Sequence, residues 1–324
     1  MLQYTLKRLL SMIPTLFIVS LLIFFIIRLI PGDPARVMLG DAAPEEKVIA
    51  LQEKLGLNEP IYKQYFVWIM DALKGDLGDS IIQRKPVVEV ISSRVECNLI
   101  LGIMSSLIII LVSIPVGVVS AVKANTWTDQ ILSSIAMFFA AVPTFWLGLT
   151  LMLMFAVALP FFPSSGFSSI LESGDLSDLR YLYHRLSLNL VLPAITVGIP
   201  NTAIVIRMIR SGMLDLMKED YVRTARSKGL SNMEINIKHV FRNSLISVVS
   251  SFGFIFAALI SGSVITENVF ALPGLGKLLT DSILQRDYPT VQGVALLLAL
   301  VFMVINFLVD ISYAKIDPRV RYND

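Results

Sequence analysis

The sequence predicts an all-α membrane protein with six transmembrane helices and both termini in the cytoplasm. Hydrophobic residues make up 55% of the 324 residues and charged residues only 16%, whereas a soluble domain usually carries about a quarter charged residues. The charges gather in a few stretches with long apolar runs between them, which indicates membrane spans rather than a water-soluble core. Lys and Arg are divided unequally between the connecting segments, and this inequality predicts the orientation.

Six apolar runs are long enough to cross a bilayer. They are Leu9–Ile30, Leu99–Val122, Ile131–Leu159, Leu186–Ile206, Leu245–Ile265 and Val291–Ile311. The first run follows Lys7 and Arg8 but precedes no small-residue cleavage site, so we expect a retained helix rather than a cleaved signal. The third run is over-long, and tilt or a kink at Pro143 would absorb the excess. Pro193 and Pro200 in the fourth run are tolerated where neighbouring helices satisfy the freed carbonyls.

The segments that share a side with the N-terminus contain fourteen Lys and Arg residues, and the two short loops on the other side contain four. An excess of basic residues marks the cytoplasmic side. The long segment Pro31–Glu96 is acidic on balance and is placed outside. We therefore divide the chain into a first transmembrane helix (1–30), an extracytoplasmic helical segment (31–97) and a five-helix core (98–324) with a cytoplasmic loop at about 208–242.

The extracytoplasmic segment is predicted to be structured. Pro60 stands where a helix can begin, and the residues after it place apolar side chains on one helical face. This face comprises Tyr62, Tyr65, Phe66, Ile69, Met70 and Leu73. The stretch Pro86–Glu96 carries Val87, Ile91 and Val95 on one face, which predicts a helix lying at the membrane interface before the second span.

The stretch between spans four and five, Glu219–Leu230, carries the most information about function. It reads E-D-Y-V-R-T-A-R-S-K-G-L, which predicts a short helix ending at Gly229, where glycine permits a left-handed cap. A second helix is predicted from about Asn232, with Ser231 as its N-cap. Two short helices joined at a glycine form a compact protrusion suited to docking in a groove.

This loop resembles the signature of the inner-membrane permeases of ABC importers, E-A-A-x3-G-x9-I-x-L-P. Ala225 and Gly229 fall on the second Ala and the Gly of that signature, while Arg223 stands at its Glu. The departures are similar to those of the dipeptide, oligopeptide and nickel permeases, which read Y-x-R-T-A-R-A-K-G-L here and R-N-x-L further on. Tyr221–Leu230 and Arg242–Leu245 follow that variant almost position by position.

Other stretches extend the resemblance over nearly the whole chain. These are R-L-I-P-G-D-P at 28–34, V-P-T-F-W-L-G at 142–148, L-P-G-L-G-K-L-L at 272–279 and R-D-Y-P at 286–289. The resemblance implies a multi-pass protein of the bacterial inner membrane that forms the channel of an ATP-driven importer for dipeptides or oligopeptides. It also implies four partners besides the bilayer: a homologous second permease, two cytosolic ATPase subunits and an extracytoplasmic solute-binding protein.

By the same resemblance, the ATPases dock on the loop, and ATP-driven closure moves it as a rigid lever. The residues expected to couple the subunits are Tyr221, Arg223, Thr224, Ala225, Lys228, Gly229 and Leu230. Ala225 is expected to allow close approach of the docking partner because it is small. The chain itself is expected to be neither an enzyme nor the binder of a cofactor, with ATP and Mg²⁺ held by the partner subunits.

The Gly-Leu-Gly-Lys stretch does not make a phosphate loop. Such a loop requires G-x4-G-K-[ST], whereas Ala271 replaces its first Gly and Leu278 its hydroxyl residue. The single cysteine, Cys97, and only two histidines make a metal site improbable. The near-neutral net charge of +2 gives no indication of nucleic acid as a partner.

Two alternatives stay open. A nickel or metallophore importer shares the same motifs. An ion-coupled secondary transporter is disfavoured, because such proteins place ionisable residues in mid-span and the middles of the six runs contain none.

Polar residues within the spans are candidates for a translocation path, although hydrogen bonding between helices is the favoured interpretation. They are Thr144, Asn201, Thr202 and Asn306. Glu267 and Asp310 lie near span ends, where snorkelling or capping is expected.

Overall fold

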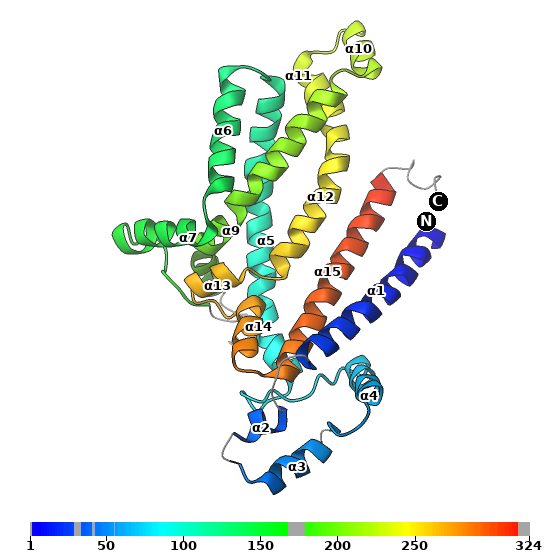
Figure 1. The fold of residues 1–324 in the computed structure, drawn as a ribbon. Coiled ribbons are helices and arrows are strands. Elements are labelled where there is room, and N and C mark those ends of the chain that lie inside the picture. The colour runs from blue at the N-terminus through cyan, green and yellow to red at the C-terminus, as the bar shows by residue number, and fades with distance from the viewer. Residues whose placement is uncertain (1, 29–33, 41–42, 55, 168–178, 317–324) are drawn as a thin grey trace.

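The computed structural model describes residues 2–28, 34–40, 43–54, 56–167 and 179–316. Within these residues the regular elements are all helical (Figure 1). In chain order they are α1 (Leu2–Arg28), α2 (Pro34–Leu39), α3 (Glu45–Lys54), α4 (Ile61–Leu73), α5 (Val87–Val122), α6 (Trp127–Ala141), α7 (Thr144–Met152), the π-helical segment η1 (Leu153–Ala158), α9 (Leu179–Leu216), α10 (Asp220–Ser227), α11 (Asn232–Glu234), the π-helical segment η2 (Ile235–Phe241), α12 (Arg242–Ile260), α13 (Val264–Val269), α14 (Leu275–Leu284) and α15 (Tyr288–Ile316).

The predicted all-α membrane class is confirmed. Among the described residues, five helical stretches are long and apolar enough to cross a bilayer, and a sixth crossing arises if one bent pair of helices counts as a span. The five stretches are Thr5–Ile26, Val87–Val122, Leu188–Leu216, Ser251–Val269 and Tyr288–Ser312. The R-L-I-P-G-D-P motif falls mainly on residues 29–33, outside the described residues.

The connections divide between the two ends of the bundle (Figure 1). The start of α1, the end of α15 and the α10–α11 protrusion lie at one end, and α2–α4 with α13 and α14 lie at the other. This arrangement agrees with the predicted topology, in which both termini share a side with the loop between spans four and five. The basic excess assigns that side to the cytoplasm.

Small residues on one face of α5 let α9 approach closely. The buried polar and glycine positions of that face are Asn98, Gly102, Ser105, Ser106, Ser113, Gly117 and Ser120. At Gly117 a Cβ atom would come within 2.8 Å of Ile209 Cβ on α9, closer than side-chain packing allows. Because lipid is as apolar as the helices, such close packing is what holds transmembrane helices together. The α5–α9 pair forms the most extensive contact in the described structure and is the centre of the core.

The third apolar run, Ile131–Leu159, forms the bent pair of helices rather than one straight span, and the kink expected at Pro143 is confirmed. The chain breaks between α6 and α7, whose axes turn by 97°, and α7 points away from the bundle (Figure 1). The break falls at Pro143, as expected, because the residue before a proline avoids helical geometry and Val142 is extended (ψ 128°). The 15 residues of α6 rise about 22 Å, less than the ~30 Å hydrocarbon core.

The stretch Pro86–Glu96 is not a separate interfacial helix, and this expectation is also wrong. It forms the first turns of α5, which continues without a break to Val122 and so crosses the boundary predicted at residue 97. The face that carries Val87 and Ile91 is buried against residues of α14 and α15, including Leu278 and Val294. Tertiary packing therefore accounts for its amphipathic pattern.

Glu267 is buried at the outer end of the bundle rather than snorkelling to an interface. The residue is 1% exposed, and it accepts hydrogen bonds from Asn98 Nδ2 at 3.2 Å and from the backbone N–H of Lys277 at 2.6 Å. Asn98 Oδ1 accepts one from the N–H of Leu275 at 2.8 Å. Side chains of α13 and α5 thus cap α14, so the capping expectation is confirmed and the snorkelling expectation is wrong. A Cβ at Gly274 would lie 2.1 Å from the Glu267 carboxyl carbon, which explains the glycine after Pro in this motif.

Asp287 attaches the extracytoplasmic segment to the membrane core. Its buried carboxylate accepts hydrogen bonds from Ser80 Oγ at 2.5 Å, the N–H of Ile81 at 3.0 Å and Thr290 Oγ1 at 2.8 Å. It stands directly before α15, where an acid also interacts favourably with the positive end of the helix. The R-D-Y-P motif therefore joins two parts of the chain that are 207 residues apart.

We predict that Asp287→Ala loosens this attachment. Removing the carboxylate leaves two hydroxyls and an amide without a buried acceptor, which costs about 2 to 3 kcal/mol. Trypsin added to the outside of sealed vesicles should cleave near Lys74 and Lys85 faster in the variant. Asp79→Ala, which removes an exposed carboxylate next to Ser80, is the control. Equal cleavage of both variants would contradict the attachment.

Candidate coupling site at the cytoplasmic end

The candidate site is the protrusion formed by α10, α11 and η2 at the end where α1 begins (Figure 1). The helix α10 ends in a complete Schellman motif. The N–H of Leu230 bonds to the carbonyl of Ala225, the N–H of Gly229 bonds to that of Arg226, and Gly229 has φ +82°. Ser231 Oγ then accepts the N–H of Glu234 at 3.3 Å. The predicted glycine cap and Ser N-cap are both confirmed.

The C-terminal part of the protrusion, α11 and η2, continues directly into the membrane helix α12. From Asn232 to Ile260 the segments α11, η2 and α12 follow one another without an intervening loop. The N-terminal part of the protrusion, α10, follows α9. The helix α9 extends to Leu216, past the predicted loop boundary near residue 208. Only three residues separate α9 from α10. The protrusion is therefore a short, mostly helical connection between the long helices α9 and α12.

One side of α10 packs inside the protrusion. Val222 and Ala225 are buried, and they share a hydrophobic cluster with Met213, Ile235 and Val240. The partly buried Tyr221 and Leu230 pack against the same cluster. Ala225 therefore does not lie on a docking face, and the expectation that it allows close approach of another subunit is wrong. Its small side chain lets α10 approach η2 within this chain.

The opposite side of α10 faces solvent. Arg223, Thr224 and Lys228, three of the expected coupling residues, are exposed, as are Arg226 and Ser227. Two apolar side chains on α11 and η2 are also exposed, Met233 by 73% and Ile237 by 46%. The Lys238 ammonium donates to Glu234 Oε1 at 2.6 Å and thereby lowers the pKa of the Glu234 carboxyl from its ordinary value. The exposed surface thus combines two apolar residues with basic ones.

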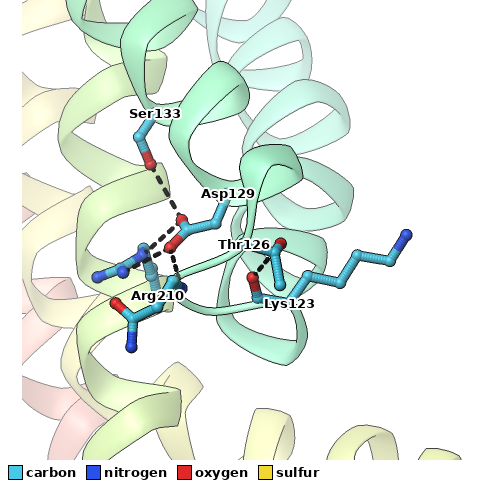
Figure 2. Close-up of polar contacts among 6 residues, drawn as sticks. Lys123, Thr126, Asp129, Ser133 and Arg210 are labelled. Atoms are coloured by element: carbon cyan, nitrogen blue, oxygen red, sulfur yellow. Dashed lines mark hydrogen bonds and ion pairs between the residues drawn. The ribbon is translucent and has the colours of Figure 1, made fainter.

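An ion pair between a buried carboxylate and a partly exposed guanidinium fixes α9 below the protrusion (Figure 2). Arg210 donates to both oxygens of Asp129, from Nε at 2.8 Å and from Nη2 at 2.7 Å. Asp129, in the first turn of α6, also accepts the backbone N–H of Asn125 at 2.9 Å and Ser133 Oγ at 3.2 Å. Planar two-point contacts of this kind fix orientation as well as distance. The turn between α5 and α6 is thereby clamped to α9 two turns before α9 ends.

Sequence reasoning missed the residues of this clamp. Arg210 was counted only as a topological charge, and Asp129 stands 81 residues away from it in the sequence. A signal for Asp129 was present, since an acid in the first turn of a helix is a typical capping residue. Met233 and Ile237 were also missed, although apolar residues four apart at the start of a polar helix could have indicated an exposed apolar patch.

The four candidate residues for a translocation path are not brought together by hydrogen bonds in the described structure. Asn201 Nδ2 and Asn306 Nδ2 each donate to the backbone carbonyl four residues earlier, and Thr202 Oγ1 donates to that of Ile199. Thr144 is the first residue of α7. Each of the three hydrogen bonds stays within its own helix. A role in translocation stays a prediction.

Asp310 forms an ion pair with Arg8 of α1. Its Oδ2 lies 3.3 Å from Arg8 Nη1, so an ion pair joins the cytoplasmic halves of α1 and α15. Asn306 lies one turn earlier on α15 and lines the same crevice between the two helices. The expectation of a snorkelling or capping role for Asp310 is corrected accordingly.

Fold and site together define an integral-membrane subunit of a solute transport system. The family model described as "Binding-protein-dependent transport system inner membrane component" matches residues 113–322, and the N-terminal model of the same family matches residues 1–102. The chain belongs to this family. The resemblance to the permeases of ABC importers that the sequence motifs indicated is thereby confirmed.

Relatives match along almost the whole chain. A peptide transport system permease protein of Brucella abortus (strain 2308) is 42% identical over 318 residues, covering 98% of each chain. The glutathione transport system permease protein GsiC of Escherichia coli (strain K12) is 39% identical over 322 residues, covering 99% of this chain and all of the relative. Among solved structures, the inward-facing MetNI methionine ABC transporter matches with a TM-score of 0.56 at 17% identity. That match covers 70% of this chain and 96% of the other, and it supports the fold alone.

We predict that the clamp behaves as a strongly coupled pair. Arg210→Met should lower the free energy of unfolding by about 3 kcal/mol, because it leaves the buried Asp129 carboxylate unpaired. Adding Asp129→Asn should recover part of this loss, because no charge then remains buried. The midpoint of thermal aggregation in detergent measures both effects. Arg207→Met, at an exposed position one turn earlier on α9, is the matched control, and additive losses in the double variant would contradict the coupling.

Proposed function

We propose that this chain is a channel-forming permease subunit of an ATP-driven peptide importer, and that separate ATPase subunits drive it through the α10–η2 protrusion. The observation that carries the proposal is the protrusion itself, a capped helical unit that continues into α12 and is joined to α9 by three residues. Family membership supplies the transport class. ATP and Mg²⁺ would be bound by the ATPases, because this chain has no G-x4-G-K-[ST] loop.

The rigidity of the protrusion supports a lever role. Val222 and Ile235 belong to a buried cluster that continues into α9 and α12 through Met213 and Val248, and this packing fixes the angle between α10 and η2. The Asp129–Arg210 pair fixes α9 to α6, and α12 continues directly from η2. A displacement imposed on α10 would therefore reach α9, α6 and α12 together. Rigid-body movement of packed helices is a common way to switch a transporter between outward and inward access.

The exposed surface indicates what a docking partner would offer. Met233 and Ile237 are exposed apolar residues of α11 and η2, and Arg223, Arg226 and Lys228 are exposed basic residues of the same protrusion. A groove with an apolar floor and an acidic rim would complement this surface. We propose that each ATPase presents such a groove to a permease. A homologous second permease and an extracytoplasmic solute-binding protein would complete the complex.

Peptides are the proposed substrates because the relatives named above are permeases of peptide and glutathione transport systems. Nickel or a metallophore is the second candidate on motif resemblance alone. The test is uptake of a labelled dipeptide and of radioactive nickel by vesicles holding the complete complex, with each competing against the other. ATP-dependent dipeptide uptake that nickel does not reduce would support the proposal. Nickel uptake without dipeptide uptake, or ATP hydrolysis by the purified single chain, would overturn it.

We predict that Gly229→Val abolishes transport while the protein remains in the membrane at near-normal level. A side chain at φ +82° costs on the order of 1 kcal/mol, and more when β-branched. A Cβ there has no atom within 4 Å, so the strain is local to the turn and should change the angle between α10 and η2. Membrane abundance, co-purification with the ATPases and dipeptide uptake should be measured together.

Gly229→Asn is the matched control, because asparagine tolerates left-handed geometry better than other residues. It should retain most uptake and co-purification. Normal uptake by Gly229→Val at normal abundance would contradict the role of the turn. Ala225→Glu is expected to reduce abundance as well as uptake, since it places a charge inside the buried cluster.

A further inference from the structure

The helix α4 carries an exposed apolar face for which packing within this chain gives no reason. Its exposed apolar residues are Ile61, Tyr62, Phe66, Val67, Met70 and Leu73, with Tyr62 77%, Phe66 63% and Leu73 76% exposed. The predicted helix start at Pro60 is confirmed. The predicted apolar face, in contrast, turns mostly away from the rest of the chain.

The contacts of α4 place it beside the membrane-spanning part of α1. Tyr65 Oη lies 2.7 Å from Ser20 Oγ, and the Tyr65 ring packs edge-on against the rings of Phe17 and Phe24. Ser20 lies six residues before Ile26, where the apolar stretch of α1 ends. At 1.5 Å per residue, the contact lies about 9 Å inside that end. The Tyr65 contact therefore lies alongside the apolar stretch of α1 and not beyond its end.

The polar contacts of α4 are consistent with this depth. At its N-terminal end Lys63 pairs with Glu59 at 2.8 Å. Gln64 accepts a hydrogen bond from Arg28, which lies beyond the apolar stretch of α1, at 2.7 Å. The polar residues thus lie toward the end of α1 that leaves the membrane. Trp68, which packs against Phe24, is of the type that gathers at the membrane–water interface.

The exposed face of α4 also continues the exposed apolar surface of the membrane-spanning helix α1. The side of α1 next to the contact exposes apolar residues of its own, namely Phe17, Ile18, Leu22, Phe25 and Ile26. Tyr62, Phe66, Ile69 and Leu73 recur at helical spacing on α4 next to the side that holds Tyr65. A helix with one such face, a polar edge and flanking charges matches the pattern of helices that lie in the interfacial plane of a membrane.

We infer that α4 is a membrane-inserted anchor of the extracytoplasmic segment, and that its Tyr62–Phe66–Leu73 face contacts the acyl chains of the outer leaflet. The interfacial helix of this chain is then α4, and not the start of α5 as the sequence predicted. A solute-binding protein approaching from water would meet the polar edge of α4. The apolar face would be covered by lipid.

Spin labels can test the environment of this face in the complete complex, reconstituted in nanodiscs of phosphatidylethanolamine and phosphatidylglycerol. The only native cysteine, Cys97, is buried and is replaced by alanine. Labels are then attached in the variants Phe66→Cys, Leu73→Cys and, as the matched control on the polar edge of the same helix, Lys63→Cys. Power saturation compares collisions with oxygen, which concentrates in lipid, and with a water-soluble nickel chelate.

The expected result is a higher ratio of oxygen to nickel accessibility at positions 66 and 73 than at position 63. A ratio at 66 and 73 no higher than at 63 would mean that water reaches the face, and it would overturn the inference. Low accessibility to both reagents at 66 and 73 would mean that another protein covers the face. That result would also overturn the inference.

Discussion

The surroundings of a membrane helix contain no water to satisfy a charge or a free helix end, so the chain must supply the partners itself. Three buried carboxylates do so in the described structure. Asp129 receives the Arg210 guanidinium and a backbone amide, Glu267 receives the amide of Lys277 at the start of α14, and Asp287 holds the segment around Ser80. Through Arg210, Asn98 and Ser80 respectively, each joins parts of the chain that are far apart in the sequence.

The three carboxylates connect different elements at the cytoplasmic and extracytoplasmic ends of the bundle. At the cytoplasmic end, the Asp129–Arg210 pair holds α6 against α9 close to the point where α9 leads into the protrusion. At the outer end, the Glu267 and Asp287 joints connect α13, α14 and the extracytoplasmic segment to α5 and α15.

Features set by neighbouring residues could be predicted from the sequence. The cap at Gly229, the N-cap at Ser231, the helix start at Pro60 and the break at Pro143 depend on local backbone chemistry, and the structure confirms each. The joints at Glu267 and Asp287 depend on partners 169 and 207 residues away, which one sequence does not reveal. For the same reason the apolar face at the start of α5 was recognised as a face but assigned to the membrane interface, whereas it packs against α14 and α15.

We propose that the protrusion moves as one rigid body with α9, α6 and α12, the membrane helices below it. The most direct measurement is the distance between spin labels at Ser227 on α10 and Gln130 on α6, both exposed positions, in the complete complex without nucleotide and with ATP trapped. The account predicts the same distance distribution in both states, while the corresponding distance between the two permease subunits changes. A shift of the Ser227–Gln130 distance between the states would contradict it.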